Sequence, residues 1–448
     1  WDWVAVDRLW IRAVDPVAAD SALTPAEEAR LGAQVVAQLY AYEYLLEDPQ
    51  LTEYLTAMGW RLAAASGTNP EHLELFVVKD PRINAFALPG GYMGFNAGLL
   101  TASSSESELA GVMAHELAHV TQRHIARGAA QGGGLSTLAT WAAVLAAVIA
   151  GSADPDVILA ALAAGQSIAY QRQVNFTRAH ELEADRIGIQ TLAEAGFDPK
   201  GMSGFFQTLE QQSRLYGSGI PEFLRTHPVN TTRIAEAQAR ASTLPQREVQ
   251  DSLEYDLMRA RTQVFAARQP SDAVDGFAAL IDNGNDTPGT RYGLAFALHQ
   301  LGQNERALDV LAPTLEQHPR HGHIALLKAA IQSGMRRTDA ALATYLRTLE
   351  LYPRWAPAVL EYAEALIRAG EPELARKVLL SHEQAFGTRL DTYRLLSLAA
   401  RESDNNAEAS YQMATYLFLR GDPGGALSQL DAGLRIAGLT PQDRARLA

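Results

Sequence analysis

The sequence contains no cysteine. This absence excludes disulfide bonds, thiolate metal sites and cysteine nucleophiles, and it leaves the redox compartment of the protein undetermined. Basic residues are also scarce, because 38 Lys and Arg stand against 51 Asp and Glu, giving a formal net charge of −13. A surface that binds phosphates needs a basic face, so we expect no nucleic-acid partner.

The sequence also has no apolar run long enough to span a bilayer comfortably. Its most apolar stretch, Leu135–Ala150, carries no charge but is shorter than the roughly 20 residues that a membrane helix needs. The stretch lies in an apolar insert at residues 128–165. A mobile lid, a peripheral membrane contact and a buried hairpin remain open for this insert, whereas its length disfavours a true span.

What is present is the composition of an ordinary globular protein, with 47% hydrophobic and 20% charged residues over a length of 448. This length suffices for two or three domains. A polar stretch at 243–253 predicts a boundary between a first domain at 21–242 and a second at 254–448. Because the chain opens on Trp1, we expect that a leader was removed or not included. Residues 1–20 show no signal-peptide pattern and stay unassigned.

The first domain mixes helices with a small sheet. Thr24, Pro25 and Glu27 make a strong helix start, and two helical stretches are expected before residue 66. Leu73–Lys79 then reads as a strand, and residues 84–95 as a hairpin that turns at Pro-Gly-Gly. We therefore predict an α+β domain.

A longer helix, predicted at Ser105–Arg127, carries the pattern H-E-x-x-H. Ser105 and Glu108 have the spacing of a capping box at its start. At about 100° per residue, the two histidines of the pattern lie about 40° apart and can hold one metal ion. They are His115 and His119. His124 is turned about 140° from His119 and is not expected to be a ligand.

Glu116 projects beside the two histidines, where it can act as a general base on water next to the metal. Hydrolytic zinc sites usually take three protein ligands, so a third must come from elsewhere. Glu181 and Asp185, on one face of a later helix, are the best candidates, whereas Glu183 points about 160° away. Glu181 would bind the metal and Asp185 would orient a ligand histidine. The alternative is a solvated acidic helix face.

The second domain repeats every 34 residues, the period of the helix–turn–helix unit called the tetratricopeptide repeat. Small and large side chains recur in one register: Ala273, Ala307, Ala341, Ala375 and Ala409, each followed four residues later by Phe277, Leu311, Tyr345, Leu379 or Met413. Twelve residues before these alanines lie small side chains, except at Arg261. We therefore predict an α-solenoid. It either recruits protein partners or braces the first domain.

Three segments together resemble the M48 family of zinc metallopeptidases: the H-E-x-x-H pattern continued to His124, the Glu181-x-x-x-Asp185-Arg186 segment, and Asn84–Gly91. M48 followed by tetratricopeptide repeats is similar to periplasmic protease–chaperones of bacterial outer-membrane β-barrel assembly. The resemblance implies one Zn²⁺ per chain, held by His115, His119 and Glu181, with Glu116 as general base. It also implies a periplasmic location, and outer-membrane proteins and their assembly machinery as partners through the repeats.

The resemblance further implies that His227 reaches the metal. His227 could fill the position of the water as a fourth ligand and keep the enzyme latent, or it could donate a hydrogen bond in the transition state, or it could be a plain loop histidine. An extended peptide is expected to pair with the hairpin edge, so the predicted substrate-binding residues are Asn84, Ala85, Phe86 and Gly90. The rival function is a chaperone or adaptor whose metal site stays closed.

Overall fold

The computed structural model describes residues 23–128, 168–215, 223–224, 227–245, 249–387 and 389–448. Residues 1–20 and the apolar insert beyond Gly128 lie outside this part of the chain. No described helix is long and apolar enough to cross a membrane. The chain forms two compact units, one of residues 1–47 and 54–252 and the other of residues 48–53 and 253–448.

The predicted fold class is confirmed, because the first unit combines helices with a small sheet and the second is helical. The sheet contains β1 (Glu74–Val78), β2 (Ala85–Leu88) and β3 (Tyr92–Asn96) in the order β1-β3-β2. β3 runs parallel to β1 and antiparallel to β2. The described sheet therefore ends at β2, whose outer edge faces no further strand.

The turn between β2 and β3 depends on glycine. Gly90 and Gly91 have φ angles of 84° and 91°. Residues that carry a Cβ atom rarely adopt this region of backbone conformation. A Cβ atom at Gly90 would also lie 2.4 Å from the Cα atom of Ala29. The hairpin can therefore pack tightly against the helix that contains Ala29, α2 (Pro25–Ala41), only with glycine here.

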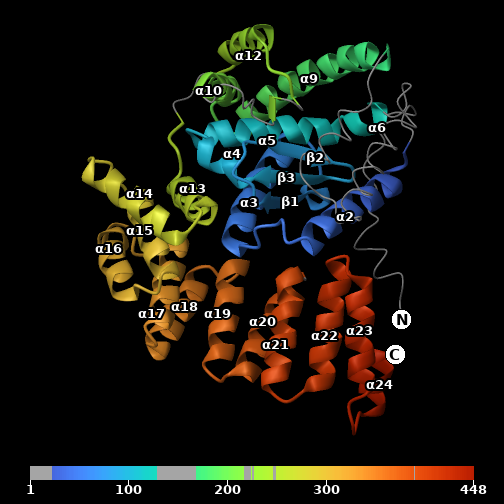
Figure 1. Ribbon diagram of the computed structural model, residues 1–448, viewed down its shortest axis with the longest axis vertical. Coiled ribbons are helices and arrows are strands. Elements are labelled where there is room, and N and C mark those ends of the chain that lie inside the picture. The colour runs from blue at the N-terminus through green and yellow to red at the C-terminus, as the bar shows by residue number, and fades with distance from the viewer. Residues whose placement is uncertain (1–22, 129–167, 216–222, 225–226, 246–248, 388) are drawn as a thin grey trace. The chain divides into compact units, whose positions relative to one another are not determined.

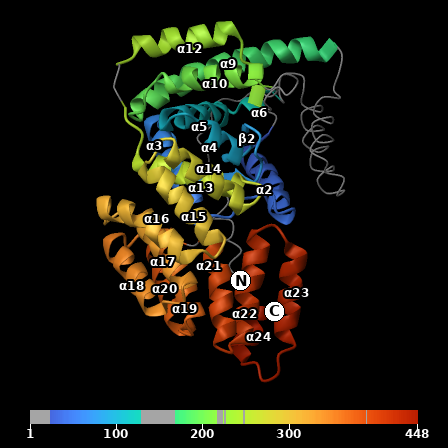
Figure 2. The same ribbon diagram turned by 60° about the vertical axis from the view of Figure 1, so that its left-hand side comes forward.

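Helices cover this sheet (Figures 1 and 2). In chain order they are α2 (Pro25–Ala41), α3 (Pro49–Ala65), α4 (Ala97–Ala102), α5 (Glu106–Thr121), α6 (His124–Gly128), α9 (Ile168–Glu194), α10 (Gly201–Leu215) and α12 (Thr231–Thr243), with a 3₁₀ turn at Pro70–His72. Figure 1 shows α5 lying between the sheet and α9. Helix α10 packs on α5, and α12 packs on both α9 and α10 (Figure 2).

The start of α5 differs slightly from the predicted capping box. The Ser105 hydroxyl accepts a hydrogen bond from the Glu108 N–H at 3.1 Å, as expected. The Glu108 carboxylate, however, accepts from the N–H of Ser104 at 2.8 Å rather than from that of Ser105. Both acceptors still satisfy free N–H groups at the start of the helix.

The prediction of one helix over Ser105–Arg127 was wrong at its end, because α5 stops at Thr121 and α6 begins at His124. Arg123 lies between them with a φ of 50°, in the left-handed region. Its guanidinium donates hydrogen bonds to Glu28 at 3.3 Å and to the Leu23 carbonyl at 2.8 Å. These distant partners stabilise a helix break that the local sequence does not announce.

The second unit has the predicted 34-residue period. Its helix pairs are α13 (Leu253–Ala266) and α14 (Pro270–Asp282), α15 (Pro288–Gln300) and α16 (Asn304–Gln317), α17 (Gly322–Gly334) and α18 (Thr338–Leu351), α19 (Ala356–Arg368) and α20 (Pro372–Phe386), and α21 (Leu390–Glu402) and α22 (Asn406–Leu419), followed by α23 (Pro423–Leu434) and α24 (Pro441–Leu447). The second helices of the pairs begin at 270, 304, 338, 372 and 406. Each pair packs on its neighbours, as a solenoid requires.

Arg261, the exception in the repeat pattern, is buried where the other units carry small residues. Its guanidinium donates hydrogen bonds to both carboxylate oxygens of Asp48, at 2.6 and 3.0 Å, and lies 4.3 Å from the centre of the Phe296 ring. Asp48 belongs to the short segment 48–53 that is part of this second unit. The irregular residue therefore has a charge partner from outside the repeats.

The same segment supplies a partner for Glu361 on α19. The side chain of Gln50 donates a hydrogen bond to the Glu361 carboxylate at 2.6 Å, and both residues belong to the second unit. Burial raises the pKa of Glu361 to about 7, because desolvation disfavours the charged carboxylate, although the charge of Arg261 opposes this. As pH rises, the Glu361 carboxyl group therefore loses its proton at a higher pH in the folded chain than in the unfolded chain.

We predict that Glu361→Gln changes the pH dependence of stability. A carboxyl group with a raised pKa in the folded state destabilises it as pH rises from the unfolded to the folded pKa, so wild type loses stability between about pH 4.5 and about pH 7. The variant cannot ionise and keeps that stability. Its thermal midpoint should exceed that of wild type at about pH 8 and match it near pH 4.5.

The control is Glu364→Gln on the same helix, where the carboxylate lies 3.8 Å from Arg368 with 41% of its side chain exposed. This control should change the midpoint little at either pH, because exposed ion pairs contribute little. A Glu361→Gln midpoint that tracks wild type across the pH range would contradict the prediction.

Candidate metal centre

The centre of the first unit is the contact between α5 and its neighbours α9 and α10. Glycines allow this contact, because a Cβ atom at Gly111 would lie 2.8 Å from the backbone nitrogen of Met202, and one at Gly188 would lie 3.2 Å from the backbone of Ala114. The residues of α5 from Ser107 to Ala118 are all buried. The pattern H-E-x-x-H thus lies in a buried helix with α9 directly beside it.

Four side chains converge between these helices. His115 and His119 come from α5, Glu181 from α9, and His227 from the segment before α12, and one ligand atom of each lies within 4.8 Å of the others. The Nε2 atoms of the two α5 histidines are 3.0 Å apart. Nδ1 of His227 lies 3.4 Å from Nε2 of His115 and 3.1 Å from a carboxylate oxygen of Glu181.

This donor set fits a divalent metal ion of the zinc type. Zinc prefers imidazole nitrogen and carboxylate oxygen ligands in a tetrahedron, and bonds of about 2.1 Å place such donors about 3.4 Å apart. The carboxylate oxygens of Glu181 lie 3.4 Å from Nε2 of His115 and 3.4 Å from Nε2 of His119. Several of the separations between the donors are therefore close to those of a tetrahedral site, and all four ligand atoms lie within 4.8 Å of one another.

The charges around the four donors favour a bound cation. Burial alone would lower the pKa of His115, but hydrogen bonds and charges of Asp185 and Glu181 outweigh it and raise that pKa to about 10. Burial, together with the charge of His115, holds the pKa of His119 well below its ordinary value. Burial would raise the pKa of Glu181, yet the charges of His227 and His115 hold it well below the ordinary value. The ionised carboxylates thus attract positive charge.

Asp185 and Glu116 lie next to the four donors without joining them. An oxygen of Asp185 is 3.0 Å from Nδ1 of His115, on the side of the ring away from the other donors. Glu116 is 1% exposed, and its Oε1 atom has no hydrogen-bond partner among the described residues. This atom lies 3.5 Å from Nε2 of His227. A buried carboxylate oxygen without a partner is costly, which indicates a functional reason for its place.

His124 is not among the four converging donors, because α6 carries it behind His119. Glu183 likewise lies away from them and contacts His124 and Arg127, each at 3.1 Å. Arg186, which is part of the quoted α9 segment, is exposed.

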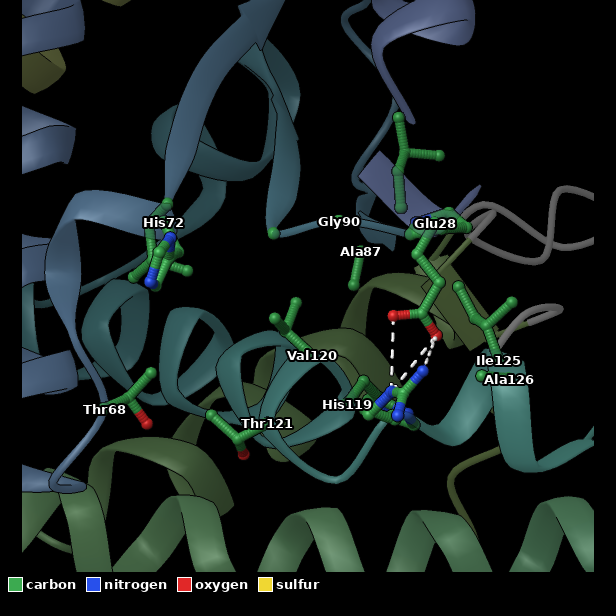
Figure 3. A pocket seen from close by; sticks show the side chains of 15 residues that line it. Glu28, Thr68, His72, Ala87, Gly90, His119, Val120, Thr121, Ile125 and Ala126 are labelled. Atoms are coloured by element: carbon green, nitrogen blue, oxygen red, sulfur yellow. Dashed lines mark hydrogen bonds and ion pairs between the residues drawn. The ribbon is translucent and has the colours of Figure 1, made fainter. Parts of the chain in front are cut away.

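A hollow lies beside His119, between the β2–β3 turn and the end of α5 (Figure 3). Its lining includes Ala87, Gly90 and Val120, together with the buried ion pair of Glu28 and Arg123. The surface is largely apolar away from that ion pair. An apolar side chain next to the four donors would find a matching environment here.

The edge strand β2 borders the site. Asn84 accepts a hydrogen bond from the N–H of Asn96, so by the alternation of an antiparallel ladder the backbone of Phe86 also pairs with β3. The backbone groups of Ala85 and Ala87 then point to the open edge. The Phe86 side chain packs on Phe76 with ring centres 5.9 Å apart, in the core on the other face of the strand.

Comparison with known proteins agrees with this arrangement. The model of peptidase family M48 matches residues 49–241, and a tetratricopeptide-repeat model matches residues 264–331. The "Beta-barrel assembly-enhancing protease" of Escherichia coli (strain K12) is 34% identical over 366 residues, which cover 81% of this chain and 74% of that protein. The protein of the same name from Yersinia pestis is 31% identical over 421 residues, 93% of this chain and 86% of that one.

The chain belongs to peptidase family M48. A more distant relative, the "Mitochondrial metalloendopeptidase OMA1" of Arabidopsis thaliana, is 33% identical over 192 residues, 42% of this chain and 36% of that protein. The predicted family and the predicted enzyme class, a metalloendopeptidase, are thereby confirmed, as is the presence of tetratricopeptide repeats.

This M48 chain contains a site residue that the sequence did not single out, Arg233 on α12. Its guanidinium donates hydrogen bonds to both oxygens of Asp185, at 2.7 and 2.8 Å, and lies 2.8 Å from the Glu181 carboxylate. Phe206 packs beneath it, 5.1 Å from ring centre to guanidinium carbon. Two buried carboxylates need a cation, but several arginines in this region could have provided it, and only the fold selects one.

We predict that Arg233→Met destabilises the metal-free M48 chain. Removing one partner of a buried ion pair leaves the carboxylates of Glu181 and Asp185 uncompensated, and we expect a loss of about 3–5 kcal/mol in the free energy of unfolding. Denaturant unfolding in the presence of a chelator measures it. The matched control is Arg240→Met, an exposed arginine on the same helix, which should shift the free energy by less than about 0.5 kcal/mol. Equal effects of the two variants would contradict the prediction.

Proposed function

We propose that the chain is a zinc-dependent endopeptidase that binds one zinc ion through His115, His119 and Glu181, with Glu116 as its general base. The observation that carries this proposal is the convergence of nitrogen and oxygen donors within 4.8 Å of one another, beside a carboxylate oxygen of Glu116 that has no hydrogen-bond partner in the described chain. The H-E-x-x-H arrangement on one helix supports the same assignment.

When bound, zinc would supply Lewis acidity that polarises the scissile carbonyl and lowers the pKa of nearby water toward about 7. Glu116 then accepts the proton of the attacking water and returns it to the departing amine. Asp185 holds the ring of His115 in one orientation and tautomer through its Nδ1 side. Arg233 in turn fixes the carboxylate of Asp185.

The substrate is proposed to be an extended polypeptide that adds to the open edge of β2. The backbone of Ala85 and Ala87 would align it with little demand on its sequence, since main-chain hydrogen bonds give the affinity in such pairing. Asn84 is buried at the start of β2, and its Oδ1 atom has no hydrogen-bond partner in the described part of the chain. We propose that this atom accepts a hydrogen bond from the peptide when the peptide adds to the strand. Gly90 lines the hollow that would receive a neighbouring side chain. Phe86 would act only through its backbone position.

The clients are proposed to be misfolded or stalled envelope proteins in the periplasm, in quality control of outer-membrane protein assembly. The names of the bacterial relatives support this role. The tetratricopeptide repeats support protein partners, among them the assembly machinery, because stacked repeats offer an extended surface. A chaperone-like contribution would come from the same surface by holding a client without cleaving it.

The deciding experiment follows cleavage of an unfolded β-barrel outer-membrane protein with and without a zinc chelator. We expect chelator-sensitive cleavage that zinc restores. Glu116→Gln should lower the rate by about 10²–10⁴-fold because the proton acceptor is lost. Zinc content, measured in parallel, should stay near one per chain. Retained cleavage in the variant would remove Glu116 as the base, and cleavage that ignores the chelator would remove the metal.

His227 gives the rival function its support. A fourth protein donor is the pattern of a closed zinc site, and His227 lies among the other three with 8% of its surface exposed. We propose that His227 occupies the fourth position and holds the enzyme latent. The alternative is that the metal site stays shut and the chain acts as a chaperone or adaptor through its repeats.

We predict that His227→Ala raises the rate of proteolysis while zinc stays bound, because three ligands remain and one position opens to water. The control is Arg240→Ala, an exposed residue of α12 that belongs neither to the four donors nor to the hollow beside His119. It should leave the rate unchanged. Unchanged or lost activity in His227→Ala, with intact zinc content, would rule out the latch. Absence of any chelator-sensitive cleavage even in this variant would favour the adaptor.

A further inference from the structure

His115 and His119 both turn their Nε2 atoms toward the centre of the site. Their Nδ1 atoms face away from it and have different partners. Nδ1 of His115 faces a carboxylate, that of Asp185, at 3.0 Å. Nδ1 of His119 faces another imidazole instead, since it lies 2.9 Å from Nδ1 of His124. His124 is 4% exposed, so water does not compete for this contact.

Beyond His124, the contacts continue to a charged pair. Nε2 of His124 lies 3.1 Å from a carboxylate oxygen of Glu183, and the same oxygen lies 3.1 Å from the guanidinium of Arg127. A carboxylate only accepts hydrogen bonds, so Nε2 of His124 must carry the proton in this contact. In neutral His124 the Nδ1 atom is then an acceptor, and it can accept only from an N–H at Nδ1 of His119.

These hydrogen bonds determine which ring nitrogen of His119 carries the proton. A histidine with its proton on Nδ1 has a free lone pair on Nε2, and Nε2 of His119 is the atom that faces His115 and Glu181. We infer that His124 is a positioning residue that, oriented by Glu183, holds His119 in the tautomer and ring orientation needed to bind the metal. The inference rests on the proposed zinc site and adds to it a support for the second histidine.

The break between α5 and α6 makes the contact possible. On one continuous helix His124 would be turned about 140° from His119 and could not face its ring. The left-handed Arg123 redirects the chain, so the His119 and His124 rings meet edge to face, with centres 4.8 Å apart and planes at 79°. The ring of His180 stacks on the ring of His124, with ring centres 4.1 Å apart and planes at 7°. The test must therefore separate hydrogen bonding by His124 from packing.

The test compares His124→Leu with His124→Asn in the full chain. Leucine fills space but accepts no hydrogen bond, whereas the Oδ1 atom of asparagine takes the place of the imidazole Nδ1 as an acceptor. Zinc affinity is measured by competition with a chromophoric chelator, and the ligand field by the visible spectrum of the cobalt(II)-substituted protein. We expect His124→Leu to weaken zinc binding about 10–100-fold and to alter the cobalt spectrum, because His119 loses its support.

His124→Asn should retain most of the affinity and the wild-type cobalt spectrum. Glu183→Leu should weaken zinc binding as His124→Leu does but less, since it frees the tautomer of His124 without removing the acceptor. His180→Phe keeps the stacked ring and serves as the control, with wild-type affinity expected. Metal-free thermal midpoints identify any variant that is misfolded.

Three outcomes would overturn the inference. Wild-type zinc affinity and cobalt spectrum in a folded His124→Leu would show that His119 needs no such support. An equal loss in His124→Leu and His124→Asn would assign the effect to packing. If the wild-type chain itself binds no zinc, the proposed metal site fails together with this inference, whereas the first two outcomes leave the metal site standing.

Discussion

Burial of several carboxylates beside histidines is the constraint on which the protease unit depends. Glu116, Glu181 and Asp185 are 1%, 3% and 5% exposed, so each has lost most of its hydration. An ionised carboxylate in such surroundings is stable only with a cation or with hydrogen-bond donors. Arg233 and His115 meet this need for Glu181 and Asp185 in the metal-free protein, and a bound metal ion would add positive charge next to all three carboxylates.

Close packing of the helices produces this burial. Gly111 and Gly188 bring α5 close to α9 and α10, so the side chains of the site face one another without a layer of water between them. In this environment each hydrogen bond is stronger and each unpaired group more costly. The Oε1 atom of Glu116 is therefore costly where it lies, because it has no hydrogen-bond partner among the described residues and the His227 ring lies 3.5 Å from it.

What the sequence could predict was set by local geometry. The face shared by His115 and His119, the face shared by Glu181 and Asp185, and the period of the solenoid all follow from residue spacing within a helix or a repeat. In each case the structure places the residues as the spacing requires.

What could not be predicted depended on residues far apart in the chain. The end of α5 at Thr121 follows from the contacts of Arg123 with Glu28 and Leu23, about a hundred positions away. Because the helix was taken as continuous, His124 was expected to point away from His119. The identity of Arg233 as the partner of Asp185 likewise depends on where α12 packs. Arg261 broke the repeat pattern visibly, but its partner Asp48 lies far outside the repeats.

The origin of each donor bears on whether a latch can work. His115, His119 and Glu181 belong to two buried helices that pack on each other, so their relative positions are fixed by the core. His227 lies outside those helices, where its N–H donates to the Phe223 carbonyl at 2.7 Å and its ring contacts the Phe223 ring at a tilt of 31°. Withdrawal of His227 would break its contacts with Phe223, Glu181 and Glu116, but it would leave the three helical donors in place. A fourth ligand on a separate short segment is therefore the one donor that can leave without dismantling the site, which is the physical requirement for a reversible latch.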